Sequence, residues 1–311
     1  MEDSDQSKEV KMINSIKITT KTGLTQTFVL RRPGDSGLLI RGVSGLGPGS
    51  VDVKLTDYAS LPGSIDSGSR KSTRNIVIDA IALWKDTVEQ ARHLAERWFK
   101  IGEKITMTFY SDTRTCYIVG VVESNEPEIF GTDGGYEGVP LQISILCPDP
   151  RFFDINDTVL VNYSSLQGGF TFPASITNAD PVGILESENK FNIDYDGTEN
   201  EGLIFTFTFK QVASKLKIIN YNIRTYMLFE GVGSIFQPGD VLTINTKVKE
   251  KSVILTRANV EYNYLNYYKL YESEWISLEQ GRNSFVIEVN GAQSTTVYNI
   301  RVAYTRAYWG I

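Results

Sequence analysis

Histidine and cysteine, which often carry acid–base, nucleophilic or metal chemistry, are few in this chain of 311 residues. His93 is its single histidine, and Cys116 and Cys147 are its two cysteines. A Ser–His–Asp or Cys–His arrangement would have to use His93, which falls on the flank of an expected helix. A zinc site built with both cysteines would lack a second histidine. We therefore identify no catalytic residue, cofactor-binding residue, cofactor or metal ligand, and we expect that the chain is not an enzyme.

The two cysteines lie in strand-like runs, so we interpret them as buried free thiols. Two cysteines are far from the density of a disulfide scaffold. We expect the chain to be made and kept on the reducing side of a membrane.

Two short stretches superficially match binding loops. Asp194-Tyr195-Asp196-Gly197 is similar to the start of a calcium loop, but it lacks the glutamate at the twelfth position, so an ordinary Asp-Gly turn is favoured. The glycine-rich stretch 42–49 lacks the Lys-Ser/Thr of a phosphate-binding loop.

Aromatic residues cluster between 262 and 275. Exposed Tyr262, Tyr264 and Trp275 could form a platform for a sugar ring. Tyrosines spaced by two are also ordinary on a strand that packs against its neighbours, and we favour this second interpretation.

Composition limits the classes of partner. The net charge is −6 and neither half of the chain is basic, so we expect no dedicated nucleic-acid binding. No apolar run approaches the ~20 residues needed to cross a bilayer. The polar start, Met1 to Asp5, leads into no apolar segment, so we expect no signal peptide.

The alternating stretch that ends at Cys147 runs into Pro148 and Pro150. Neither a strand nor a helix can continue through both prolines. We therefore predict a stiff joint here, packed through the aromatic pair that follows it, between domains at 1–148 and 149–311.

The first domain is predicted to be β-rich with one helix. Hairpins are expected around Lys21-Thr22-Gly23 and Ser111-Asp112, and a strand is expected from Arg74 to Leu83. Apolar residues at helical spacing, with a capping box at Asp86 and Glu89, predict a helix over 87–100. The Gly- and Ser-rich region 33–73 is either a set of short irregular strands or a segment ordered by a partner; the sequence leaves both open.

The second domain reads as successive strands separated by turns, which is typical of an antiparallel sandwich or barrel. The sharpest turns are Gln237–Asp240 and Glu279–Asn283.

The order of several of these pieces resembles that of phage distal tail (Dit) proteins, a family of siphophage tail-tip components. In the first half, the stretches that carry the resemblance are Arg74–Ile78, Leu94, Ile105–Phe109, Arg114–Val119 and Leu146–Phe153. In the second half, they are Gln237–Thr246, Lys251–Val253, Trp275–Asn283 and Val302–Tyr308.

The resemblance implies a mainly β chain with a ring-forming N-terminal domain and a galectin-like C-terminal sandwich. It implies a structural, hexameric component of the virion, assembled in the bacterial cytoplasm. The implied partners are further copies of the chain, the tail tube protein above the ring, the tail-tip hub protein below it, and receptor-binding proteins; no membrane partner is implied. We hypothesise that Leu38, Leu39, Ile40, Val43 and Leu46 lie in or beside the contact between subunits.

Two other classes stay open. The first is a carbohydrate-binding adhesion module that uses Tyr262, Tyr264 and Trp275. The second is a hydrolase with a sandwich domain attached, for which the sequence offers no nucleophile and base.

Overall fold

The computed structural model describes residues 13–32, 37–59, 61–83, 88–127, 138–156, 158–161, 190–290 and 298–311. The chain divides into two compact units. Unit 1 contains residues up to Ile155 together with Tyr308–Ile311, and unit 2 contains Asn156–Ala307. We propose that these units are the two domains of the protein.

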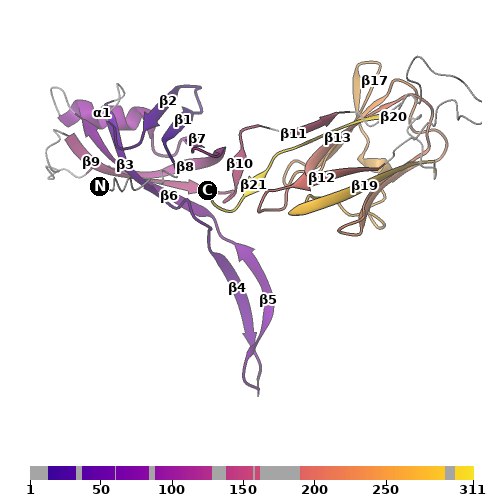
Figure 1. Cartoon of the computed structure of the whole chain (residues 1–311), viewed down its shortest axis with the longest axis horizontal. Coiled ribbons are helices and arrows are strands. Elements are labelled where there is room, and N and C mark those ends of the chain that lie inside the picture. The colour runs from indigo at the N-terminus through magenta and orange to yellow at the C-terminus, as the bar shows by residue number, and fades with distance from the viewer. Residues whose placement is uncertain are drawn as a thin grey trace, which may run out of the picture. The chain divides into compact units, whose positions relative to one another are not determined.

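Unit 1 is built on one large antiparallel sheet (Figure 1). Its main path runs in the order β2 (Thr25–Val29), β1 (Ser15–Thr20), β7 (Lys104–Tyr110), β8 (Thr115–Pro127), β9 (Gly138–Cys147), β6 (Arg74–Leu83) and β3 (Leu38–Ser44). Two short strands, β10 (Phe152–Asp154) and β21 (Ala307–Tyr308), pair off this path.

Alternation along the strands creates the core of unit 1. Ile16 and Ile18 of β1, and Ile76 and Ile78 of β6, are fully buried, while the residues between them are less so. Because successive side chains on a strand point to opposite faces, these residues line one face of the sheet.

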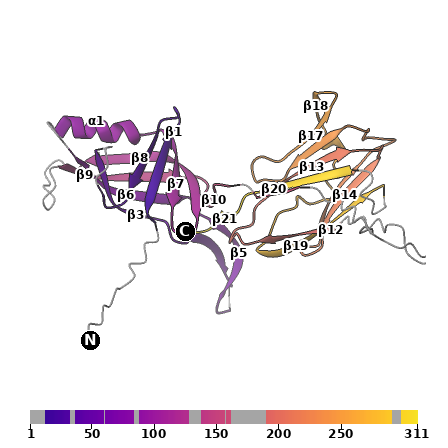
Figure 2. The ribbon, with the colours of Figure 1, turned by 45° about the horizontal axis from the view of Figure 1, so that its top comes forward.

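The helix α1 (Val88–Trp98) covers this face, as Figure 2 shows. Trp98 and the following Phe99 are buried, and both rings lie within 6.4 Å of the ring of Phe28. The prediction of a helix over 87–100 is confirmed, whereas the proposed cap at Asp86 lies outside the described residues. Gly102 has a φ of 79°, and its amide donates to Val122 rather than to the end of the helix.

The predicted interruption of the sheet by two prolines is confirmed. Strand β9 ends at Cys147, and the ring of Phe152 is then buried against Phe109 at a centroid distance of 5.9 Å. Phe152 thus belongs to the core of unit 1. The compact unit itself extends to Ile155, seven residues beyond the boundary predicted at residue 148.

The region 33–73 contains three strands with different surroundings. β3 pairs with β6 in the large sheet, while β4 (Val51–Asp57) and β5 (Ser64–Lys71) pair with each other as a separate two-stranded sheet. Short strands were one of the two alternatives that the sequence left open.

Unit 2 consists of two antiparallel sheets. The first runs β11 (Thr158–Val161), β20 (Tyr298–Tyr304), β13 (Leu203–Phe209), β16 (Val241–Asn245), β17 (Ser252–Arg257) and β18 (Val260–Asn263). The second runs β12 (Lys190–Tyr195), β19 (Gly281–Val289), β14 (Lys215–Asn220) and β15 (Thr225–Glu230). A single-turn 3-10 helix, η1 (Leu265–Tyr267), follows β18.

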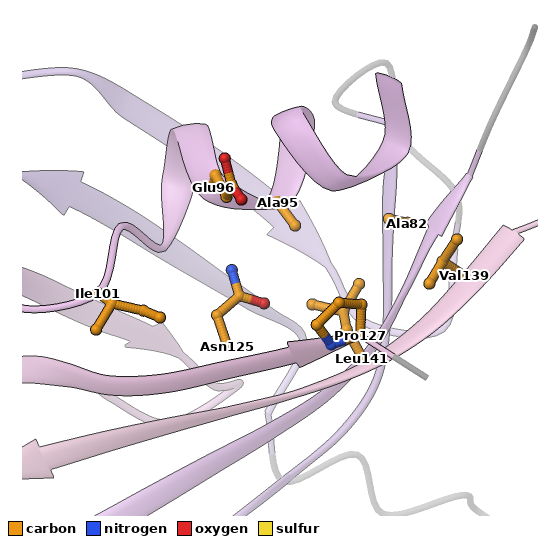
Figure 3. Close-up of a pocket in the computed structure, with 8 residues that line it drawn as sticks. All are labelled: Ala82, Ala95, Glu96, Ile101, Asn125, Pro127, Val139 and Leu141. Atoms are coloured by element: carbon orange, nitrogen blue, oxygen red, sulfur yellow. The ribbon is translucent and has the colours of Figure 1, made fainter. Parts of the chain in front are cut away.

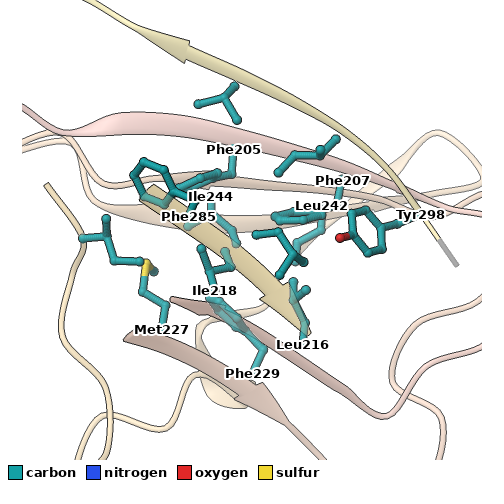
Figure 4. Close-up of a cluster of buried hydrophobic side chains, with 14 of the residues drawn as sticks. Phe205, Phe207, Leu216, Ile218, Met227, Phe229, Leu242, Ile244, Phe285 and Tyr298 are labelled. Carbon is teal, nitrogen blue, oxygen red and sulfur yellow. The ribbon is translucent and has the colours of Figure 1, made fainter. Parts of the chain in front are cut away.

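Side chains from both sheets of unit 2 meet in one aromatic core (Figure 4). Phe205 and Phe207 of one sheet and Phe285 of the other are fully or almost fully buried, and Phe205 meets Phe285 edge-to-face at 6.0 Å. The predicted mainly β fold is confirmed, and α1 is the single α-helix among the described residues.

Candidate assembly surface

The β4–β5 hairpin is the most exposed element of unit 1. All residues of both strands are exposed, and Figure 1 shows the hairpin extending away from the large sheet. A two-stranded hairpin is marginally stable in water unless one of its faces packs against something else. Its exposure therefore marks it as a candidate contact surface.

One face of this hairpin carries a row of apolar side chains. Val51, Val53 and Leu55 alternate along β4 and are 41%, 55% and 62% exposed. The register places Lys71, Ser69 and Asp66 opposite them. A row of exposed branched side chains between charges of both signs is the usual composition of a protein contact.

The base of the hairpin is organised by the buried Arg74. Its Nη1 donates to the carbonyl oxygens of Gly45 and Gly47, both at 2.6 Å, and its Nε donates to Pro150 O at 2.7 Å. Its Nη2 donates to Trp309 O. Burial lowers the pKa of Arg74 from its ordinary value, and the nearby Cys147 opposes that change. One side chain thus joins four separate backbone positions.

Trp309 packs against the same base. Its indole Nε1 donates to Gly49 O at 3.1 Å, and Lys71 Nζ lies 4.8 Å from the centre of its ring. Residues just before β4 and at the end of β5 therefore both contact Trp309.

In unit 2, the turn predicted at Gln237–Asp240 is held by a buried carboxylate. Asp240 is 1% exposed and accepts hydrogen bonds from the amide of Gln237 and from the guanidinium of Arg257. Gly239 supplies the left-handed backbone of the turn, with φ at 90°.

A second predicted turn is held by Asn283, which is also buried. Its Nδ2 donates to the carbonyl oxygens of Glu279 and Gly281, and its Oδ1 accepts from the amide of Glu279. The polar residues that carried the sequence resemblance here thus stabilise turns.

Part of the chain, most of it in unit 2, matches a known protein family. Residues 196–308 match the family described as "Siphovirus-type tail component, C-terminal domain". The match covers less than half of the chain, and almost all of it lies within unit 2. The predicted resemblance to distal tail proteins is confirmed, since this stretch is similar to the C-terminal domain of a siphovirus-type tail component.

Similarity to solved structures extends over almost the whole chain. The crystal structure of SPP1 Dit, described as a hub of the adsorption apparatus in phages that infect Gram-positive bacteria, is 11% identical with a TM-score of 0.64. The match covers 94% of this chain and 98% of that one, so the two share a fold.

Two structures of the phage P2 baseplate in its activated conformation, with Ca and with Sr, are each 10% identical. The first covers 95% of this chain and 98% of that one, with a TM-score of 0.46, and the second covers 93% and 97%, with 0.42. No curated protein matches the chain.

The side chains predicted to lie in the subunit contact are placed largely inside unit 1. Leu38, Leu39 and Ile40 are at most 4% exposed, and Val43 and Leu46 are half-buried against the same core. The side chains of Leu38, Leu39 and Ile40 therefore leave almost no exposed surface for a neighbouring subunit. What remains of the hypothesis is that β3, an end strand of the sheet, lies beside such a contact.

The three aromatic residues of the alternative sugar platform do not share one exposed surface. Tyr264 is 8% exposed and donates its hydroxyl hydrogen to Ile235 O, while Tyr262 is 47% exposed. Trp275 packs partly against the core of unit 2, with its ring 5.0 Å from that of Tyr268. Because Tyr264 is buried, the proposed platform is not formed.

The other chemistry-bearing residues are dispersed. His93 is 70% exposed on α1, where Glu89 and Glu96 lie 3.9 and 3.5 Å from its ring nitrogens. Cys116 and Cys147 are buried free thiols. Within the described ranges, no group of three or more His, Cys, Asp or Glu residues could hold a metal ion.

A small pocket lies between α1 and the sheet of unit 1, and Figure 3 shows its lining. It has a volume of about 60 Å³, and its lining is mainly apolar but includes the side chains of Glu96 and Asn125. Sites for small molecules usually measure about 300 Å³ or more. In the part of the chain that the structure describes, no helix is long and apolar enough to span a bilayer.

Proposed function

We propose that the chain is one subunit of a hexameric ring that joins the tail tube to the tail-tip hub. In this proposal unit 1 forms the ring, and unit 2 anchors receptor-binding proteins. The match of residues 196–308 to a siphovirus-type tail component and the fold shared with SPP1 Dit support this proposal. We also propose that the subunit catalyses no reaction and acts only through non-covalent contacts with its neighbours.

The exposed β4–β5 hairpin is the observation that carries the ring proposal. A closed ring requires two different surfaces on each subunit that fit one another. The hairpin supplies one surface, with Val51, Val53 and Leu55 in its centre. Burying such side chains stabilises an association by about 25 cal/mol for each Å² of apolar area removed from water.

The charges around this row specify the opposing surface. Asp66 and Lys71 lie on the same face of the hairpin as the apolar row. The neighbouring subunit must therefore present an apolar strip with an acidic and a basic position that match these charges in reverse order. Such pairing at the rim of a contact fixes register more than it adds affinity.

Native mass spectrometry of the purified chain tests the ring proposal. We expect the wild-type chain at six times its monomer mass, and Val51→Thr/Val53→Thr at the monomer mass. Threonine keeps the shape and strand propensity of valine while adding a hydroxyl, so the hairpin itself should form.

The matched control is Val212→Thr/Val232→Thr, which changes two exposed valines of unit 2 and should keep the wild-type mass. A wild-type chain that stays monomeric in the presence of its tail tube and hub proteins would refute the ring. A Val51/Val53 variant that retains the ring would refute the role of the hairpin.

A further inference from the structure

We propose that the segment Tyr308–Ile311 positions the β4–β5 hairpin for assembly, so that the contact surface is set only after unit 2 has been made. The inference rests on the proposed function, since it concerns the same hairpin. Its evidence is a set of contacts within unit 1 that join positions more than 200 residues apart in the sequence.

The segment is bound along the backbone that leads into β4. The amide of Ile311 donates to Leu46 O at 3.1 Å, and the indole of Trp309 donates to Gly49 O at 3.1 Å. At Gly310, a Cβ atom would come within 2.8 Å of the backbone nitrogen of Pro48. Glycine at this position permits the close approach of the two backbones.

Arg74 connects the same two segments from inside the unit. It donates to Gly45 O and Gly47 O on one side and to Trp309 O on the other. Its guanidinium also lies 5.5 Å from the centre of the Trp309 ring. The Trp309 side chain thus lies between the strand start near Gly49 and the strand end at Lys71.

These contacts matter because the hairpin is not held along its length. Its strand residues are all exposed, and the bonds between Ser72 and Ser50 or Asp52 join the two strands to each other. The direction of the hairpin is therefore determined at its base, where residues 45–49 and Lys71 meet Trp309.

The position of Tyr308–Ile311 in the sequence determines when the base of the hairpin can form during synthesis. Unit 2 spans Asn156–Ala307, so Tyr308–Ile311 leaves the ribosome after all of unit 2. Until then, the base of the hairpin lacks Trp309. A subunit whose second unit is not yet made would then present an unpositioned hairpin and would be excluded from the ring.

Hydrogen exchange of the full chain, measured by mass spectrometry, tests the positioning. In Trp309→Ala we expect amides in 45–57 and 64–72 to exchange about tenfold faster, with those of β7 and β8 unchanged, because only the base contacts are lost. Trp309→Phe keeps a ring beside Lys71 but loses the bond to Gly49, so we expect a smaller increase. Tyr271→Ala, at a fully exposed aromatic residue of unit 2, is the control and should match the wild type.

Unchanged exchange at 45–72 in Trp309→Ala would overturn the inference. If that variant loses the fold of unit 1, Gly310→Ala decides instead. It should accelerate exchange at 45–72 alone, and wild-type exchange there would overturn the inference.

Native mass spectrometry of the same samples separates this inference from the ring proposal. A monomeric wild-type chain contradicts the ring but leaves the exchange comparison valid. A ring of unchanged mass and yield, formed by a variant whose hairpin exchanges faster, overturns the role of positioning in assembly.

Discussion

Arg257 binds the carboxylate of Asp240 through Nε at 2.8 Å and Nη2 at 2.5 Å, although the aspartate is almost completely buried. Burial alone would raise the pKa of Asp240. The hydrogen bonds from Arg257 and from the amide of Gln237, together with the charge of Arg257, outweigh it and lower that pKa below its ordinary value of 3.8. The pair joins the start of β16 to the end of β17.

This pair predicts how the stability of unit 2 depends on pH. Because the folded-state pKa of Asp240 is lowered, its contribution is complete above about pH 5, well above the ordinary value of 3.8, and is lost as the pH falls through the folded value. Asp240→Asn should reduce the free energy of unfolding by about 2 kcal/mol at pH 7. Urea denaturation should show this deficit shrinking towards pH 2, whereas Asp194→Asn, an exposed control, should show none. A deficit independent of pH would contradict the role of the charge.

We predict that replacing Arg74 lowers the stability of unit 1 alone. Arg74→Met removes the Arg74 donor from the carbonyl oxygens of Gly45, Gly47, Pro150 and Trp309. A carbonyl oxygen left without a partner costs about 1–3 kcal/mol where water cannot reach it. We expect unit 1 to lose about 3 kcal/mol of its free energy of unfolding.

Hydrogen exchange under increasing urea measures the Arg74 effect separately in each unit. Strands β6 and β9 report on unit 1, and β13 and β16 serve as the internal reference in unit 2. Arg70→Met, on the exposed hairpin, is the matched control. Equal losses in both units would show that Arg74 does not act within unit 1 alone.

Elements with a buried face could be predicted from the sequence. The strand expected from Arg74 to Leu83 is β6, because alternating apolar residues that face a core repeat at the period of a strand. The helix and the proline stop after Cys147 were predictable for the same kind of local reason. Neither depends on the rest of the chain.

The assembly surface was not predictable in the same way. Val51, Val53 and Leu55 alternate like the buried residues of any strand, and only the tertiary arrangement shows that no sheet covers them. Conversely, Leu38 to Ile40 form an apolar run in a glycine-rich stretch, which suggested a partner. In the structure they belong to β3, which pairs with β6, and all three are buried within unit 1. A local sequence pattern therefore shows which residues alternate between the two faces of a strand. It does not show which face another part of the molecule covers.

Leu38 and Leu55 should therefore respond in opposite ways to truncation. Leu38→Ala removes a side chain from the core of unit 1 and should cost about 3 kcal/mol of stability. Leu55→Ala removes an exposed side chain and should change stability by about 0.5 kcal/mol or less. It should nevertheless weaken the ring, measured as the fraction of oligomer at a fixed protein concentration. If a Leu38 variant kept its stability but failed to assemble, the Leu38 side chain would have to lie in the contact between subunits.

We predict that the thiols of Cys116 and Cys147 react slowly in the folded chain. Burial, helped by Asp154 and opposed by Arg114, raises the pKa of Cys116 to about 11. Burial, opposed by the charge of Arg74, raises the pKa of Cys147 to about 12. The thiolate is the reactive form, so at pH 8 about one Cys116 in a thousand is reactive, and Cys147 is less so.

A disulfide reagent followed by absorbance should therefore react with neither cysteine in the native chain within minutes at pH 8, and with both in 6 M guanidinium (about the concentration that unfolds most domains). Between pH 7 and pH 9 the native rate should keep rising about tenfold per unit, since both thiols titrate well above that range. The control variant Thr56→Cys places a thiol on the exposed hairpin, where it should react rapidly and level off above pH 9. Rapid reaction of the unmodified chain at pH 8 would show that unit 1 opens near these strands, because burial is what protects both thiols.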